Sequence, residues 1–403
     1  MTEATSPPKN QIAPGHPTDP PFSKPRGATL HVINRYIPYG ASRNLHFVLD
    51  WEARHGYEPH IAMGGTVSFE VPQHVVVHRI PTLRRAPAPI DDVRSLRRIS
   101  DLIESVRPVV LQTHQSKSGI LGRLAARGRV PAVIHTIHMP SFGAGYSRLG
   151  SITYRALERR CASYTDLFVA VSKELEASYL EAGIGRADQY TVIRSRIDLE
   201  SYVSIRSASR GQRSEWRRRY RIPAEGRVIL VAGLLEARKR VDLIIRRLTP
   251  LLASGRATLV VAGDGNERKA LETLAKVSGL SEAVMFLGFV SEFAEILGSA
   301  DVLVHASTSE GIAQVVLQAA ASGTPVVATE AVGLAEIPGK TVAIVDRQGA
   351  GLLAACELAL AGRSAAPAGS ADFGPWSAEV IDGQLRALHD RVASLLRGKT
   401  QWN

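Results

Sequence analysis

Short runs of apolar residues alternate with longer amphipathic segments along most of the chain. The first run, Thr29 to Asn34, is rich in β-branched and aliphatic residues and predicts a buried strand. After Gly40 the apolar residues take helical spacing, at Leu45, Val48, Leu49 and Ala53. The alternation of strand and helix continues to about residue 200 and begins again at Arg227. It predicts two doubly wound, Rossmann-like α/β domains that face a cleft.

The chain divides into four parts. Residues 1–26 hold seven prolines and no continuous apolar segment, so we expect a disordered tail rather than a secretory signal. One Rossmann-like domain is expected over residues 27–200 and a second over residues 201–375, with a last amphipathic helix over residues 376–403. No run of about 18 apolar residues occurs, so no membrane span is predicted.

The formal net charge of +11 predicts anionic partners. Sugar nucleotides, phosphorylated acceptors, an acidic membrane and nucleic acid all fit that charge. Neither a zinc-ligand pattern nor an aromatic-basic motif occurs, so we expect no nucleic-acid partner. Cys161 and Cys356 fall in different halves of a chain without an export signal, which predicts buried free thiols and a cytoplasmic location.

The stretch from Ser309 to Thr329 carries the most specific chemical pattern. Its start predicts a turn that leads directly into a helix, and Ser322-Gly323 ends that helix before a strand. This places Glu310 and Gln318 two helical turns apart on nearly one face. Two such groups at the mouth of a parallel sheet can hold two parts of one elongated polar ligand.

Two segments predict phosphate binding. The turn at Gly40 and Ala41 lies between a strand and a helix, an arrangement that directs backbone N–H groups at a phosphate. In the second domain, Lys239 follows the strand that begins at Arg227 and lies close to a helix start. It can neutralise a diphosphate there as a compact point charge. Gly263 forms the corresponding turn after the next strand.

Polar residues also gather at strand ends in the first domain. His114 and Lys117 follow a strand and precede a helix, which is where open α/β sheets place ligand groups. A purely structural role for His114, as a capping or core histidine, remains an alternative. The loop from His138 to Gly145 is rich in small residues and would let a second substrate approach closely.

Together these segments resemble the retaining glycosyltransferases of the two-domain GT-B fold, the family 4-like or group 1 glycosyltransferases, over roughly residues 28–395. The family has two glutamates separated by seven residues, and this chain has Glu310 and Gln318 there. Lys239 matches the lysine of the family's GR…K motif. The resemblance implies an acceptor-side first domain, a donor-binding second domain and a last helix that returns to the first. It implies a donor site formed by Gly40, Ala41, Gly233, Arg238, Lys239, Gly263, Glu310, Gly311, Ile312 and Gln318, and acceptor-side residues Lys117, His138 and Ser141.

The resemblance also implies metal-independent transfer of a sugar, with retention, from an activated donor that is most simply a nucleoside diphosphate sugar. Lys239 would stabilise the leaving diphosphate, Glu310 would hold the sugar hydroxyls, and His114 would contact the sugar near the reacting carbon. The diphosphate could itself take the acceptor proton, so no cofactor is expected. No dinucleotide fingerprint follows the first strand, which disfavours a dehydrogenase.

Three residues depart from the family pattern. Leu234 replaces a phosphate-binding arginine, for which Arg238 could substitute, and Gln318 replaces a glutamate. Arg196 replaces a glycine; because a side chain at positive φ is costly, the backbone there is expected to differ. These departures leave two alternatives open. One is a donor without a nucleoside, such as phosphoribosyl diphosphate, and the other is a non-catalytic GT-B partner protein. The presence of Glu310 and Lys239 favours an active enzyme.

The sequence does not specify the acceptor, and a small molecule or a lipid-linked sugar would both fit. Biosynthesis of an envelope glycan and of a glycosylated natural product are both open. Arg94, Arg97 and Arg98 lie on one face of a predicted helix at 91–106. A solvated helix face is the simpler interpretation, and a weak peripheral membrane contact is kept as a hypothesis.

Overall fold

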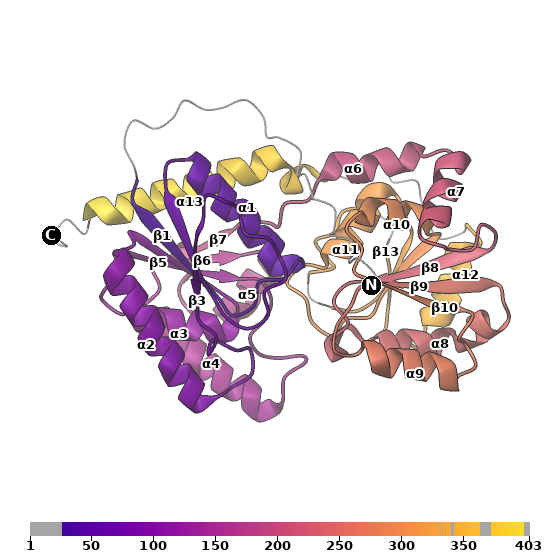
Figure 1. The fold of residues 1–403 in the computed structure, drawn as a ribbon, viewed down its shortest axis with the longest axis horizontal. Coiled ribbons are helices and arrows are strands. Elements are labelled where there is room, and N and C mark those ends of the chain that lie inside the picture. Colours follow the sequence, from indigo (N-terminus) through magenta and orange to yellow (C-terminus); the bar gives the residue numbers. More distant parts are fainter. Residues whose placement is uncertain (1–25, 332, 340–341, 363–371, 399–403) are drawn as a thin grey trace, which may run out of the picture.

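A computed structural model of the chain describes residues 26–331, 333–339, 342–362 and 372–398. The chain forms two α/β halves side by side, each built on a parallel sheet with helices on both faces (Figure 1). The predicted fold class, two Rossmann-like sheets, is therefore confirmed. The expected tail lies outside the described residues except for Arg26, and the domain boundaries stay predictions.

The first sheet has the order β3-β2-β1-β4-β5-β6-β7 in the described part of the chain, and every pairing is parallel. Parallel neighbours need crossover connections, and helices supply most of them, whereas a loop connects β2 to β3. The elements are β1 (Ala28–Ile33), α1 (Gly40–Arg54), β2 (Glu58–Met63), β3 (Val76–Arg79), α2 (Pro89–Val106), β4 (Val110–His114), α3 (Ser116–Ala126), β5 (Ala132–Ile137), α4 (Arg148–Ala162), β6 (Leu167–Ala170), α5 (Lys173–Glu181), η1 (Ala187–Gln189) and β7 (Tyr190–Val192).

The second sheet follows the connecting segments α6 (Leu199–Val203), η2 (Ser204–Ser207) and α7 (Arg210–Arg219), and its order is β10-β9-β8-β11-β12-β13. Its elements are β8 (Arg227–Ala232), η3 (Ala237–Lys239), α8 (Val241–Ala253), β9 (Ala257–Ala262), α9 (Arg268–Val277), β10 (Val284–Gly288), α10 (Phe293–Ser299), β11 (Val302–His305), α11 (Gln314–Ser322), β12 (Val326–Thr329), β13 (Val342–Val345) and α12 (Leu352–Leu360).

The last two elements are η4 (Gly374–Trp376) and α13 (Ala378–Gly398), and α13 lies across the first half of the molecule (Figure 1). Its apolar face packs with residues of β4, β5 and β6, and Asp382 accepts a 2.6 Å hydrogen bond from the Trp51 indole of α1. The C-terminal helix therefore ties the end of the chain to the first sheet.

Both cysteines are buried and free, as predicted. Arg196 does not adopt positive φ, and its guanidinium lies over the Phe47 ring at 4.8 Å. The backbone there thus avoids the conformation in which the family's glycine would be needed, in agreement with the expectation that it runs differently.

The prediction that Glu310 and Gln318 lie two turns apart on one helical face is wrong, although the helix that ends at Ser322 is present. Helix α11 begins only at Gln314, so Glu310 lies in the preceding loop and not on a helical face with Gln318. Contacts with the first half hold this loop in place. The carbonyl of Gly311 accepts a 2.9 Å hydrogen bond from the Ser172 hydroxyl, and a Cβ on Gly311 would lie 1.9 Å from the His138 carbonyl oxygen.

Candidate active site

A cleft of about 1150 Å³ lies between the two halves. Its lining residues follow the carboxyl ends of β1, β4, β5, β8, β9 and β11. Open α/β sheets bind ligands at that end of their strands, because loops and helix N-termini present polar groups there. The cleft is large enough for an extended polar ligand together with a second substrate.

Most of the residues predicted for the site line this cleft, and they come from both halves. They are Gly40, Ala41, Lys117, His138, Ser141, Gly233, Arg238, Lys239, Glu310 and Ile312. Four others do not line it: His114, Gly263, Gly311 and Gln318. The roles assigned to all of these residues stay predictions.

Gly263 does not line the cleft, but it determines how closely two of the cleft loops approach each other. Gly263 has φ +150°, and a Cβ there would lie 1.9 Å from the Gly233 carbonyl oxygen. The loops after β8 and β9 can approach each other this closely because Gly263 has no side chain. The turn at Gly233 in turn lies beside Lys239, whose Cε is 3.6 Å from the position that a Cβ on Gly233 would take.

Glu310 is the centre of a buried ionic cluster on the second half. Its Oε1 accepts hydrogen bonds from Nζ of Lys239 and, at 3.2 Å, from Nη1 of Arg238. The same Arg238 nitrogen donates to the Ser309 carbonyl at 3.2 Å, which fixes the loop before α11. Arg238 therefore lies in the same cluster as Lys239, and its substitution for the family's arginine at Leu234 stays a prediction.

Glu236 connects this cluster to the first half. Its Oε2 accepts from Nε of Arg238 at 3.1 Å, and its Oε1 accepts from Arg35 at 2.8 Å and from Arg85 at 2.7 Å. Among the described residues these ion pairs join four cations to two carboxylates, so the cluster keeps two net positive charges. We call it the cationic cluster: Arg35, Arg85, Glu236, Arg238, Lys239 and Glu310.

The protonation of the cluster follows from burial and from the paired charges. Burial alone would raise the pKa of Glu310, but Lys239 and Arg238 outweigh it and hold that pKa well below its usual range. Burial lowers the pKa of Lys239, an effect that Glu310 opposes. Burial, with the charge of Lys239, lowers the pKa of His305 to about 3, so this ring 3.6 Å from Glu310 is neutral.

The part of the first half around His138 and Ser141 lines the cleft with neutral groups, and we call this part the neutral wall; Arg35 and Arg85 of the same half belong to the cationic cluster. The Ser141 hydroxyl donates to the buried Glu158 at 3.1 Å and accepts from the Tyr179 hydroxyl at 2.8 Å. Glu158 is in turn paired with Arg123 at 2.6 Å. Lys117 also lines the cleft; it is buried and paired with Asp92, so its charge is already compensated. This wall offers hydrogen-bonding groups without net charge.

His114 lies one layer behind the cleft surface. It is 1% exposed, and its ring nitrogens face His31 at 3.1 Å and His138 at 3.0 Å. The structure thus gives it the core position that the sequence left open as an alternative. Its contact with a donor sugar stays a prediction. Among the described residues, the histidines that line the cleft are His135 of β5 and His138, which follows β5.

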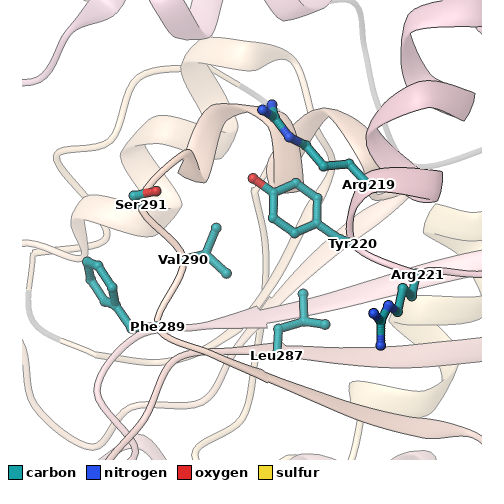
Figure 2. Close-up of a pocket in the computed structure, with 7 residues that line it drawn as sticks. All are labelled: Arg219, Tyr220, Arg221, Leu287, Phe289, Val290 and Ser291. Atoms are coloured by element: carbon teal, nitrogen blue, oxygen red, sulfur yellow. The ribbon is translucent and has the colours of Figure 1, made fainter. Parts of the chain in front are cut away.

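A second, smaller pocket of about 300 Å³ adjoins the cleft at the end of β10 (Figure 2). Phe289 lines both cavities, and its ring meets Tyr39 of the first half edge to face at 5.6 Å. In Figure 2 Phe289 and Arg221 lie at opposite ends of the pocket. Arg219 and Tyr220 are both bonded to Glu295, at 2.6 Å and 3.2 Å.

Sequence reasoning missed several polar residues that the fold brings together. Arg35 follows the end of β1, and this position at the carboxyl end of a strand could have identified it. Glu236 and Arg85 have no comparable local pattern, because they are 151 residues apart and Arg35, which also pairs with Glu236, is 201 residues from it. Glu52 did have one: it follows Leu45 and Leu49 on the apolar face of α1, where a carboxylate needs an explanation.

The chain has two parallel sheets whose carboxyl ends face a charged cleft. This is the architecture of the GT-B fold. Residues 226–361 match the family model described as "Glycosyl transferases group 1", and residues 40–195 match the model described as "Glycosyl transferase 4-like domain". Together the two matches cover more than two thirds of the chain. The chain belongs to the group 1 glycosyltransferases of the GT-B fold and is a glycosyltransferase.

Relatives agree with this assignment. The putative glycosyltransferase EpsD of Bacillus subtilis is 27% identical over 76% of this chain and 81% of its own length. An Escherichia coli UDP-Gal:alpha-D-GlcNAc-diphosphoundecaprenol alpha-1,3-galactosyltransferase is 26% identical over 61% of this chain and 64% of its own. The Anabaena protein HepE, solved with UDP and glucose, has the same fold, with a TM-score of 0.69, 19% identity and coverage of 90% of this chain and 99% of its own.

In the described residues, none of the helices combines the length and the apolar composition that a membrane span requires.

Proposed function

We propose that the chain transfers a sugar from a nucleoside diphosphate donor to an acceptor hydroxyl, with retention, in the biosynthesis of an envelope glycan or a glycosylated natural product. The observation that carries this proposal is the cationic cluster, whose two excess positive charges lie in the cleft. A nucleoside diphosphate leaving group carries a complementary negative charge. Lys239 and Arg238 would stabilise this charge as it develops on the leaving oxygen.

Glu310 plays a different part in this proposal. Lys239 and Arg238 orient its carboxylate, and Oε1 is engaged by both of them. The other oxygen can accept hydrogen bonds from donor sugar hydroxyls. The nucleoside would extend toward Phe289, beside the turn after β10, where the chain lines both the cleft and the smaller pocket. The acceptor would enter along the neutral wall.

Relatives support a nucleotide donor. The E. coli relative is named for UDP-Gal and a diphosphoundecaprenol-linked acceptor, and HepE was solved with UDP and glucose. Retention fits a cleft in which the diphosphate, held by the cationic cluster, takes the acceptor proton on the face from which it leaves. His305, 3.6 Å from Glu310, is buried in the second half, and its pKa of about 3 makes it a weak base.

The proposal includes a lipid-linked acceptor and a weak contact with an anionic membrane. Helix α4, which follows the acceptor-side loop, exposes Leu149 and Ile152, and α2 exposes Ile90 and Val93. Exposed apolar side chains on helices that also carry arginines favour an interfacial contact. Co-sedimentation with anionic vesicles tests it: the Leu149→Ser/Ile152→Ser variant is expected to bind less than the parent chain, and equal binding would contradict the contact.

Calorimetry with a donor panel tests the donor class. UDP-glucose, UDP-galactose, GDP-mannose and phosphoribosyl diphosphate are titrated into the parent chain, into Lys239→Ala and into Lys276→Ala, an exposed lysine of α9 in the same half. We expect a nucleotide sugar to bind to the parent and to Lys276→Ala but not to Lys239→Ala. Binding of phosphoribosyl diphosphate alone, or of none of the four, would contradict the proposal.

Retention is tested separately by the product. Slow hydrolysis of the bound donor releases free sugar, and NMR recorded before mutarotation identifies its first anomer. An α-linked nucleotide sugar is expected to give the α-anomer. Release of the β-anomer would show inversion.

A further inference from the structure

Four polar side chains connect the back of the first half to the cleft. At the far end, Oε2 of Glu52 lies 2.8 Å from Nε2 of His31. Nδ1 of His31 lies 3.1 Å from Nε2 of His114, and Nδ1 of His114 lies 3.0 Å from Nε2 of His138. Glu52 and His31 are fully buried, whereas His138 lines the cleft. We call Glu52, His31, His114 and His138 the histidine chain.

Glu52 is ionised although it is buried. Burial alone would raise its pKa, but His31 and His389 beside it, together with a 2.6 Å hydrogen bond from the Thr29 hydroxyl, hold the pKa below its ordinary value. Nε2 of His389 lies 3.7 Å from the other carboxylate oxygen. The far end of the histidine chain therefore carries a negative charge that can only accept hydrogen bonds.

This charge fixes the direction of every hydrogen bond that follows. Because Glu52 accepts, Nε2 of His31 carries a proton, and in a His31 ring that holds a single proton Nδ1 is then an acceptor. Nε2 of His114 must in turn be the donor to His31, and Nε2 of His138 the donor to His114. Burial lowers the pKa of both His114 and His138, the latter to about 4, which keeps these rings neutral near pH 7.

We propose that Glu52 sets the tautomer of His138, so that His138 presents an unprotonated Nδ1 as acceptor to a sugar hydroxyl in the cleft. Among the described residues, the hydrogen bond of the His138 ring is made by Nε2 and not by Nδ1. Glu52, His31 and His114 are thus positioning residues that act through His138. The hydroxyl contact rests on the proposed function, whereas the tautomer does not.

Neighbouring groups do not compete for this role. His135 lies beside the histidine chain, and burial lowers its pKa, as does the charge of Arg123. Its Nδ1 faces the Thr113 hydroxyl at 2.9 Å rather than His138. Arg123 itself is paired with Glu158 at 2.6 Å. Glu52 is therefore the charge to which the histidine chain connects.

NMR of the full-length chain labelled with ¹⁵N-histidine tests the tautomer. Long-range ¹H–¹⁵N spectra distinguish a ring protonated at Nε2 from one protonated at Nδ1, and the His138→Gln variant assigns the signals by their loss. We expect His138 of the parent chain to be protonated at Nε2. Protonation at Nδ1 would overturn the inference. The tautomer is measured on the parent chain, and the His138→Gln variant serves only to assign its signals.

Two substitutions of His31 test the origin of the tautomer. In His31→Gln, the amide can donate to Glu52 and accept from His114, so it preserves the direction and His138 is expected to stay protonated at Nε2. In His31→Leu the connection is cut, and both tautomers of His138 are expected in comparable amounts. If His31 had only a structural role, His31→Gln and His31→Leu would not differ in the tautomer of His138. The same tautomer in both would contradict control by Glu52.

A second histidine pair is an internal control. Nδ1 of His60 lies 2.9 Å from Nε2 of His78, on β2 and β3, outside the histidine chain. The signals of His60 and His78 are expected to stay unchanged in the His31 variants. A change there as large as at His138 would mean that the variants act by disturbing the sheet, and this would overturn the inference.

Ligand titrations identify the hydroxyl. A shift of the His138 Nδ1 resonance with UDP-glucose, but not with UDP alone, would identify a donor hydroxyl. A shift only with UDP plus methyl α-D-glucoside would identify an acceptor hydroxyl. No shift with either would overturn the hydroxyl contact. Failure of UDP to bind at all, measured by calorimetry, would count against the proposed function and leave the tautomer result in place.

Discussion

The two walls of the cleft solve the problem of a buried polar site in opposite ways. The wall from the second half places charged groups against one another, with Lys239 and Arg238 on Glu310. The wall from the first half contains neutral rings and hydroxyls, such as His138 and Ser141. Charge is expensive to bury unless it is paired, and an incompletely compensated cluster favours an anionic ligand. Neutral acceptors instead suit hydroxyl groups.

This contrast teaches how one cleft can treat two substrates differently. The cationic cluster would hold the leaving group by charge, with an effect that grows as negative charge develops. The neutral wall would orient substrate hydroxyls through directional hydrogen bonds. Because its groups are uncharged, they would contribute little to the affinity for an anion. Substitutions in the two walls should therefore separate effects on the diphosphate from effects on transfer.

The largest effect is expected from Lys239→Ala. It removes a buried cation from the position proposed for the leaving group, and losing one such contact typically lowers the rate by about 10²–10³-fold. Single-turnover transfer or donor hydrolysis measures it, with circular dichroism to establish that the fold is kept. Lys276→Ala should have the parental rate. A Lys239→Ala rate within threefold of the parent would remove Lys239 from the mechanism.

Glu310→Gln should separate binding from turnover. It deletes one of the two carboxylates of the cationic cluster, so UDP is expected to bind up to about tenfold more tightly because less positive charge is compensated. Transfer is expected to fall by about 10–100-fold, since the acceptor for the sugar hydroxyls is weakened. Calorimetry with UDP and a transfer assay are read together. Weaker UDP binding would show that Glu310 mainly positions Lys239.

Acid should destabilise the chain through its neutral histidines. In the folded state the pKa of His138 is about 4, of His389 about 4 and of His305 about 3, all below the ordinary value of 6.5. The unfolded state therefore binds more protons below about pH 6.5. The free energy of unfolding should fall by up to about 1.4 kcal/mol per pH unit for each of these histidines as the pH drops from 6.5 toward 4.

Urea unfolding between pH 7 and pH 4.5 measures this dependence. The His389→Phe variant removes one histidine outside the cleft and should give a shallower slope. A free energy of unfolding that is constant down to pH 5 would contradict the neutral assignment of these rings.

The smallest of these effects is expected from His138→Gln. Transfer should fall by about tenfold, since one hydrogen bond to a hydroxyl is lost. The affinity for UDP should stay within twofold, because His138 is neutral and belongs to the opposite wall. A large loss of UDP affinity would show that His138 also contributes to diphosphate binding, which would contradict separate roles for the two walls.

The fold was predictable from the sequence because each half repeats a strong local pattern. The alternation of apolar strands and amphipathic helices identified both sheets. The start of α11 was not predictable, because the loop at Glu310 is held by Ser172 and by the His138 backbone, more than 130 residues away in sequence. Gln318 lies in α11 as predicted, but Glu310 does not share its helical face, because the helix begins only at Gln314.

The site was predictable where a strand end or a family motif marked it, as at Lys239 and His138. The partners of these residues were not. Arg85 and Glu236 form an ion pair only because the two halves face each other, and no local sequence pattern predicts that contact. Glu52 is the instructive exception: the helical spacing after Leu45 and Leu49 already placed a carboxylate on a buried face.

The most direct test of the account is the contribution of the diphosphate to binding. Calorimetry compares UDP with uridine, and GDP with guanosine, on the parent chain and on Lys239→Ala. If the cationic cluster is the diphosphate site, at least one nucleoside diphosphate should bind the parent about 10²-fold or more tightly than its nucleoside, and most of that difference should vanish in Lys239→Ala. Equal affinities for each nucleoside and its diphosphate in the parent would contradict the account.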